Sequence, residues 1–183
     1  MRADGERNRV KVLDAAVAAF ATEGLSVPVA EIARRAGVGT GTVSRHFPTK
    51  ESLYEAIVLS RVEEIVDHAQ HLIATLDSTD AFFGYFEYKV RQAAANRGLA
   101  QTLSGDGFDI EAAAAGTGHD LDGVEAGLLA RAQQAGAVRI DVTNEDVKAL
   151  VVGCLARERQ PPDVAARRRM VDIVRTGLAP SVH

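Results

Sequence analysis

Residues 29–51 of the chain read VAEIARRAGVGTGTVSRHFPTKE. Apolar side chains stand on both sides of its glycines: Ile32 before them, and Val43 and Phe47, which are four residues apart, after them. This spacing is typical of one buried face on each of two short helices. A turn at Gly37 leaves little chain between them, so the segment predicts a helix-turn-helix.

The second helix of such a motif enters the major groove of DNA, and its outward side chains meet bases and phosphates. Thr40 is expected to cap this helix, whose free N–H groups can bind a phosphate oxygen. Arg45 can bond guanine through two N–H groups. Lys50, at the start of the next helix, can hold a phosphate as a point charge. The candidate DNA contacts are Thr40, Thr42, Ser44, Arg45, His46 and Lys50.

This segment resembles the TetR family of one-component bacterial repressors. The resemblance covers roughly residues 7–55 and rests on Ile32-Ala33, Ala36-Gly37-Val38, Gly41-Thr42, His46-Phe47 and Lys50. The family usually has a tyrosine where this chain has Ser44. A relative's operator sequence is therefore not transferred to this chain.

The resemblance implies a fold of about nine helices, with a three-helix DNA-binding domain at residues 1–50 and an effector-binding and dimerisation domain at residues 51–183. It also implies a homodimer that represses from a palindromic DNA operator, and a small effector that separates the two DNA-reading heads. The dimer helices would be those near residues 143–157 and 163–178, whose apolar stripes suit a four-helix bundle. The alternative is that these stripes pack only within one monomer.

Helical periodicity extends along the whole chain, and no segment alternates as a strand does, so the predicted fold class is all-α. The first helix is expected to bury Val10, Leu13, Val17 and Phe20. Gly98 is expected to interrupt a helix over residues 80–97, which Ser78-Thr79-Asp80 would cap. Further helices are predicted over residues 50–76 and 121–135, over the two dimer ranges, and in a short stretch within the glycine-containing connection 104–120. Thr143 and Asp163 are the expected caps of the last two helices, and Pro161-Pro162 separates them.

Composition fits a soluble globular protein. The chain has 183 residues, of which 46% are hydrophobic and 25% charged, and its net charge is −4. Residues 1–50 hold 8 Lys and Arg against 5 Asp and Glu, while the rest holds 13 against 20. This asymmetry suggests a basic module on an acidic body, although chance could also produce it. With no apolar leader, no membrane-length apolar run and a single cysteine, Cys154, we expect a cytoplasmic protein without membrane contact.

An effector site is predicted from the aromatic residues, because five of the nine lie within residues 82–88. Phe82, Phe86 and Lys89 share a helix face and are candidate pocket residues. Phe108 and His119, in or beside the glycine-containing connection, are candidates to close the pocket. The aromatic side chains could instead be plain core, and the latter two residues could lie in an exposed loop.

No nucleophile elbow, phosphate-binding loop or paired metal motif is present, so we expect neither an enzyme nor a cofactor. Glu64, His68 and His71 have metal-compatible spacing, but a solvated helix surface is the preferred interpretation, and no metal is predicted. A metal-responsive regulator and an effector-independent DNA-binding protein remain the alternatives. Cys154 is interpreted as a small hydrophobe rather than a redox sensor. Residues 167–169, three arginines, suit a solvated face or intersubunit ion pairs better than a second nucleic-acid patch.

Overall fold

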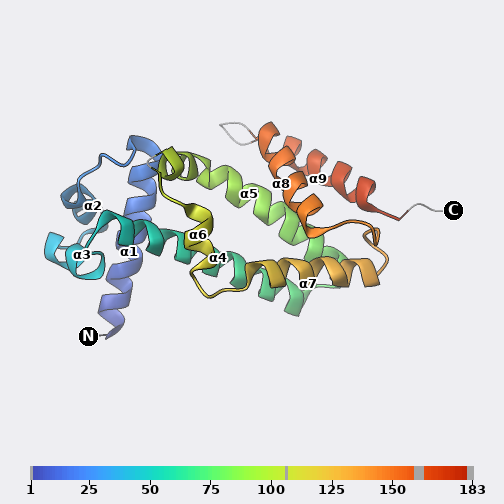
Figure 1. Ribbon diagram of the computed structural model, residues 1–183, viewed down its shortest axis with the longest axis horizontal. Helices are drawn as coiled ribbons and strands as arrows, with labels where there is room; N and C mark the ends of the chain where they lie inside the picture. Colours follow the sequence, from blue (N-terminus) through green and yellow to red (C-terminus); the bar gives the residue numbers. More distant parts are fainter. Residues whose placement is uncertain (1, 106, 159–162, 181–183) are drawn as a thin grey trace. The chain divides into compact units, whose positions relative to one another are not determined.

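The computed structural model describes residues 2–105, 107–158 and 163–180, and this part of the chain contains nine α-helices and no strand (Figure 1). The predicted all-α class is confirmed. The helices are α1 (Arg2–Glu23), α2 (Val29–Ala36), α3 (Thr40–His46), α4 (Lys50–Thr75), α5 (Ser78–Gly105), α6 (Ile110–Ala115), α7 (Leu121–Gln134), α8 (Asn144–Arg157) and α9 (Val164–Leu178).

The helices pack into two compact units. The first unit is Met1–Val62 together with Asn96–Gly118, and the second is Glu63–Ala95 together with His119–His183. The long helices α4 and α5 each contribute residues to both units. The packing therefore does not divide the chain at one point, and the functional boundary expected at residue 50 stays a prediction.

Helix α1 buries Leu13 and Phe20, as expected, and Val17 is partly buried against the same core, but Val10 does not belong to the buried face. Val12, Ala16 and Ala19 are fully buried and Phe20 is 1% exposed, whereas Val10 is 49% exposed. The expectation for Val10 was wrong because hydrophobicity alone ignored the alanines, whose small side chains let neighbouring helices approach closely. The ring of Phe20 packs edge-on against Tyr54 of α4, with centroids 5.5 Å apart, a favourable aromatic geometry.

Helix α5 does not break at Gly98, as the sequence had suggested, but continues to Gly105. A glycine inside a helix costs about 1 kcal/mol. Beyond it, Leu99 and Leu103 are buried in the core of the first unit, and each buried leucine stabilises by about 1.5–3 kcal/mol. The glycine also allows close packing, because a Cβ at this position would lie 3.3 Å from the carbonyl oxygen of Ala21.

The helix caps expected at α8 and α9 are confirmed. The Thr143 hydroxyl and the Asp146 carboxylate form a reciprocal capping box at α8, and Asp163 accepts from the Ala166 N–H at α9. At α5 the expected Ser78-Thr79-Asp80 caps were wrong, because the carboxylate of Asp77, just before the helix, accepts from the N–H groups of Thr79 and Asp80. The predicted break at Pro161-Pro162 lies outside the described residues.

The core of the second unit is built on the aromatic side chains of α5. Phe82 and Phe83 pack edge to face with centroids 5.0 Å apart. Buried residues of α7, α8 and α9 complete this core, among them Leu128, Val151 and Val174. Cys154 is part of it, and burial raises the pKa of its thiol, as expected for a small hydrophobe.

None of the described helices combines the length and the apolar character that a membrane span requires.

Candidate nucleic-acid interface and ligand cavity

The helix-turn-helix forms where it was predicted. Helix α2 ends at Gly37, whose φ of 68° is left-handed, a conformation that glycine adopts without a steric penalty. The N–H of Val38 then donates to the carbonyl of Ala33 at 3.0 Å, which satisfies a terminal carbonyl of the helix. Helix α3 begins two residues later. The tight turn therefore follows from the position of one glycine.

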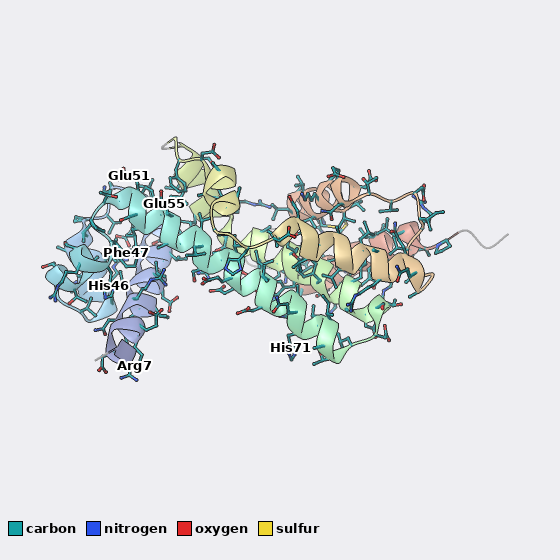
Figure 2. All side chains as sticks on the ribbon, turned by 60° about the horizontal axis from the view of Figure 1, so that its bottom comes forward. Arg7, His46, Phe47, Glu51, Glu55 and His71 are labelled. Carbon is teal, nitrogen blue, oxygen red and sulfur yellow. The ribbon has the colours of Figure 1, made fainter. Side chains whose placement is uncertain are left out.

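One face of α3 is fixed by burial. Val43 is fully buried and Phe47 is 6% exposed, and both belong to the same core as Ile32 of α2. The inward orientation predicted for these residues is confirmed. Figure 2 shows Phe47 beside His46 at the C-terminal end of α3. Because one side of α3 is anchored in the core, its opposite side is presented to solvent.

The predicted DNA contacts occupy this accessible surface. Thr42 is half-buried, and the other five are exposed: Thr40, Ser44, Arg45, His46 and Lys50.

Two of these side chains are already oriented by hydrogen bonds. Nε of Arg45 donates to the Gly41 carbonyl at 3.0 Å, which leaves its two Nη groups for bidentate bonding. Nζ of Lys50 donates to the Leu25 carbonyl at 3.0 Å and thereby ties the start of α4 to the loop after α1. Lys50 thus has a structural contact that the sequence did not reveal.

Thr40 does not cap α3. The N-cap is Gly39, with an extended ψ of 148°, and no side chain forms a cap hydrogen bond there. Thr40 is the first helical residue, so its hydroxyl is not engaged in capping. The expectation was wrong by one position, because a glycine can serve as N-cap when the chain enters the helix from an extended conformation.

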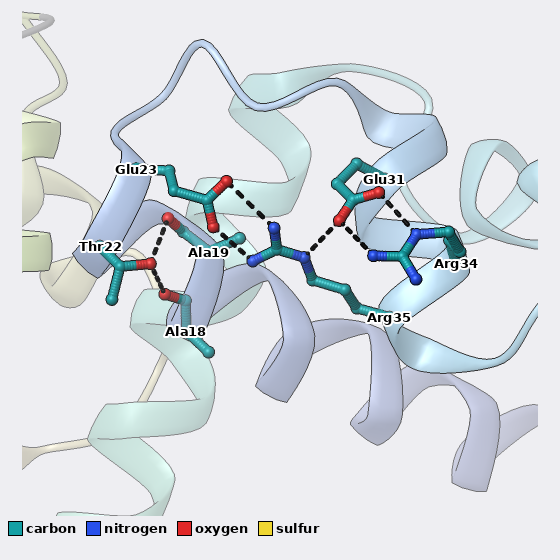
Figure 3. Close-up of polar contacts among 7 residues, drawn as sticks. All are labelled: Ala18, Ala19, Thr22, Glu23, Glu31, Arg34 and Arg35. Carbon is teal, nitrogen blue, oxygen red and sulfur yellow. Dashed lines mark hydrogen bonds and ion pairs between the residues drawn. The ribbon is translucent and has the colours of Figure 1, made fainter.

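A surface network of ion pairs fixes α2 against α1 (Figure 3). Arg35 donates through Nη1 and Nη2 to the Glu23 carboxylate at 2.6 and 3.0 Å, and through Nε to Glu31 at 2.7 Å. Arg34 forms two further hydrogen bonds to Glu31, both at 2.7 Å. The bonds from Arg34 and then Arg35 lower the pKa of Glu31 to about 2. Because solvent screens these charges, the network mainly sets the orientation of α2 and α1.

The second unit contains a cavity of about 250 Å³ lined by α5, α7 and α8. Most of its walls are apolar, and the polar groups are few, as in ligand sites of other proteins. The lining residues are Phe82, Tyr85, Phe86, Lys89, Ala93, Glu125, Asn144, Val147, Lys148, Val151 and Val152.

A buried carboxylate organises the polar groups of this cavity. Glu125 is only 7% exposed. Its Oε1 accepts from the Tyr85 hydroxyl at 2.7 Å and from Nζ of Lys89 at 2.6 Å. Burial, followed by the charge of Glu125, raises the pKa of Tyr85, so the phenol stays protonated as a donor. A buried charge requires such partners, because an unpaired one is strongly destabilising.

The structure brings together three of the five predicted pocket residues, since Phe82, Phe86 and Lys89 all line the cavity. Phe108 packs edge-on against Tyr54 in the first unit, with centroids 5.6 Å apart. His119 is exposed, and its Nε2 lies 3.7 Å from Oε1 of Glu63. Neither of these two lines the cavity, and their contribution to a ligand site stays a prediction.

Sequence reasoning missed Tyr85 and Glu125. A signal for Glu125 exists, because it occupies the first position of the stripe that Leu128, Leu129 and Ala132 complete three, four and seven residues later. All four residues are buried on α7. An acid on the apolar face of a helix points to a buried polar site.

The described residues give no support to a metal site or to a second nucleic-acid patch at residues 167–169. No group of three His, Cys, Asp or Glu in this part of the chain is arranged to hold a metal ion. His68 instead stacks on Tyr88, with centroids 3.8 Å apart. Arg167 is buried and forms two hydrogen bonds to Glu158, at 2.7 and 2.9 Å, whereas Arg168 and Arg169 are exposed. The first of these arginines is therefore an intrachain structural residue.

An all-helical chain with an exposed helix-turn-helix and a mostly apolar cavity in separate units defines a helix-turn-helix transcriptional regulator. Residues 12–57 match the family described as bacterial regulatory proteins, tetR family. Residues 77–180 match the family described as transcriptional regulator SbtR-like, C-terminal domain. The chain belongs to the TetR family of transcriptional regulators, which are DNA-binding regulators and not enzymes.

Solved structures agree with this assignment. A TetR transcription regulatory protein from Mycobacterium vanbaalenii is 45% identical, with a TM-score of 0.80 over 98% of this chain and 99% of that chain. A TetR transcriptional regulator from Streptomyces coelicolor is 32% identical, with a TM-score of 0.77 over 95% and 99%. A gamma-butyrolactone receptor, described as ArpA-like, is 22% identical, with a TM-score of 0.71 over 96% and 90%, and shares the fold.

Proposed function

We propose that this chain is a transcriptional repressor that binds a palindromic operator as a homodimer and leaves it when a small molecule binds. The observation that carries the proposal is the exposed polar face of α3, held in place by burial of Val43 and Phe47. DNA contact is assigned to residues 1–50, through Thr40, Thr42, Ser44, Arg45, His46 and Lys50. Effector binding and dimerisation are assigned to residues 51–183.

The dimer part of the proposal is supported by apolar side chains that one chain leaves in solvent. Val152 of α8 is 65% exposed, and Ile173 of α9 is 63% exposed. Exposed large apolar residues on two helices that pack against each other are typical of an interface. Two copies of α8 and α9 can bury them in a four-helix bundle. A two-fold axis through that bundle pairs two α3 helices, which matches a palindrome.

The effector part of the proposal is supported by the cavity among α5, α7 and α8. Phe82 and Phe86 supply apolar contacts there and Lys89 a polar one. The cavity shares α8 with the proposed dimer surface, because Val151 and Val152 both line the cavity and Val152 is also 65% exposed. A ligand that displaces α8 would therefore change the geometry of the dimer.

The experiment is selection of binding sites from a pool of random duplex DNA at near-physiological salt, followed by sequencing. The proposal predicts an enriched palindrome. Recovery of salt-sensitive background binding alone, also after unfolding and refolding to remove a retained ligand, would contradict it. The selection is repeated with Arg45→Ala. Arg131→Ala is the charge-matched control for this variant, because Arg131 is exposed on α7 in the second unit.

The dimer is tested separately by sedimentation of Ile173→Glu, which places a charge on the proposed interface. The wild type is expected at twice the chain mass and the variant at the chain mass. A monomeric wild type that still selects a palindrome would contradict the α8–α9 interface.

A further inference from the structure

Two acids on one face of α7 hold lysines from two other helices. Glu125 accepts from Lys89 of α5, and Oδ1 of Asp122, three residues earlier, accepts from Nζ of Lys148 of α8 at 2.7 Å. Both lysines line the cavity. The two ion pairs therefore connect α7 to each of the other helices that form the cavity walls.

The charges of this network are balanced. Each lysine of the lining is paired with one carboxylate: Lys89 with Glu125, which also lines the cavity, and Lys148 with Asp122, which is exposed and lies outside the lining. The remaining lining residues are neutral. A ligand with a net charge would upset this balance in a mostly apolar cavity, where an uncompensated charge is expensive. Glu125 would repel a carboxylate ligand, and Lys89 and Lys148 would repel an ammonium ligand. The electrostatics therefore favour a neutral ligand.

The hydrogen-bonding groups are not saturated. A carboxylate offers about four acceptor positions, and Glu125 uses two of them, for Tyr85 and Lys89. An ammonium has three N–H groups, and Lys89 uses one of them for Glu125. The cavity thus offers both an acceptor and a donor at one place. A hydroxyl group, which donates one hydrogen bond and accepts others, complements this pair.

The volume limits the size of the ligand. At about 250 Å³, the cavity lies below the range of about 300–1,000 Å³ that is usual for drug-sized ligands. Phe82 and Phe86 provide flat apolar walls for a ring or a short hydrocarbon body. A compound with one ring fits this space better than one with several fused rings.

We infer that the cavity binds a small neutral alcohol, with its apolar body against Phe82 and Phe86 and its hydroxyl donating to Glu125 and accepting from Lys89. This inference rests on the proposed function, in which the same cavity is the effector site. Binding at this position engages the ion pair between α5 and α7.

The test uses four probes of nearly equal size: benzyl alcohol, toluene, benzylamine and benzoate. Binding to the full-length protein is measured by titration calorimetry at neutral pH, where benzylamine is cationic and benzoate anionic. Benzyl alcohol is expected to bind most tightly. A charged probe that binds more tightly, or an alcohol no tighter than toluene, would overturn the inference. So would failure of all four probes to bind.

Substitutions at Glu125 and Tyr85 test which of these residues binds the hydroxyl group of the alcohol. Glu125→Gln is expected to weaken benzyl alcohol binding about tenfold, the loss typical of a hydrogen bond to a charged group, and to leave toluene unchanged. Asp67→Asn, the same chemical change at an exposed position of α4, is the control. Tyr85→Phe frees an acceptor position on Glu125 and is expected to preserve the alcohol's affinity. A loss in Tyr85→Phe equal to that in Glu125→Gln would place the hydroxyl on the tyrosine and overturn the assignment. Thermal unfolding establishes that each variant is folded.

A separate readout distinguishes failure of this inference from failure of the proposed function. Operator affinity is measured with and without saturating benzyl alcohol. If the alcohol binds as predicted but operator affinity does not change, the assignment of the cavity stands. The proposal that the ligand releases the operator is then contradicted. If operator binding is observed but none of the four probes binds, the regulator stands and the ligand class is wrong.

Discussion

Glu31 in the first unit and Glu125 in the second each accept hydrogen bonds from two side chains, and the two carboxylates lie in opposite environments. Glu31 is at the surface, and both of its partners, Arg34 and Arg35, are exposed. Glu125 is 7% exposed, and it faces a cavity lined mainly by apolar side chains. Solvent and salt screen the charge of Glu31 strongly, whereas they screen the charge of Glu125 very little.

In the proposed function, this difference separates the unit that contacts DNA from the unit that binds the effector. In the first unit the charges lie outside a packed core, so they orient α2 and α1 while Val43 and Phe47 anchor α3. In the second unit a charge is placed where apolar packing would be more stable. Such placement is typical of binding sites, where stability is lower than it could be.

The largest effect is expected from the core of the first unit. Phe20→Ala removes a ring that is 1% exposed and packs edge-on against Tyr54. The free energy of unfolding should fall by about 3–5 kcal/mol, and DNA binding should be lost with the unit's structure. Urea denaturation measures the change. A decrease below about 1 kcal/mol would show that this core repacks easily.

The contrast between the two carboxylates is tested by their alanine variants. Glu125→Ala leaves Tyr85 and Lys89 without their shared acceptor, so the free energy of unfolding should fall by about 1–3 kcal/mol. Glu31→Ala should have a smaller effect, because its ion pairs are exposed. Urea denaturation of both variants decides the order. Equal decreases in the free energy of unfolding would show that the buried and the exposed carboxylate contribute alike.

Arg45→Ala should change DNA recognition at one position. If its Nη groups contact guanine, the loss in affinity for the selected operator is about 1–3 kcal/mol, and preference at a single base pair relaxes. Repeating the selection with this variant and with Arg131→Ala measures the change. An unaltered base preference would reduce Arg45 to a phosphate contact or exclude it from the interface.

Lys50 is expected to contribute affinity without sequence preference. Lys50→Gln removes the charge while keeping an N–H donor for the Leu25 carbonyl. The slope of log affinity against log salt should become shallower by about 0.9, the value for one phosphate contact. Fluorescence anisotropy at several salt concentrations measures this slope. Identical slopes for the variant and the wild type would assign Lys50 a purely structural role.

The smallest effect concerns acid stability. The pKa of Glu31 is lowered from 4.5 to about 2 in the folded chain, so in acid the unfolded chain takes up a proton at this residue before the folded chain does. The stabilising contribution is complete above about pH 4.5 and is lost as the pH falls through about 2. The urea midpoints of wild type and Glu31→Gln should therefore converge between these limits. A constant gap would show that the network does not depend on this ionisation.

The sequence predicted the helix-turn-helix well because the signals that define this motif are local. The two short helices expected on either side of Gly37 are α2 and α3. The spacing of Val43 and Phe47 and the turn at Gly37 depend on neighbours only a few residues away. The same local signals placed the caps at Thr143 and Asp163.

Features that depend on distant partners were not predictable. The continuation of α5 through Gly98 depends on burial of Leu99 and Leu103 in the first unit. The partners Lys89 and Glu125 are 36 residues apart, and periodicity within one helix cannot pair them. Spacing could place Phe82, Phe86 and Lys89 on one face, but which helix covers that face is determined by tertiary packing.

The central claim is that the exposed face of α3 reads a specific operator. The most direct measurement is a fluorescence anisotropy titration of the wild type with the selected palindrome and with the same duplex scrambled in both half-sites, at near-physiological salt. The account predicts binding to the palindrome at least about 10³-fold tighter than to the scrambled duplex, with two chains bound per palindrome. Equal affinity for the two duplexes, lost alike as salt is raised, would contradict it.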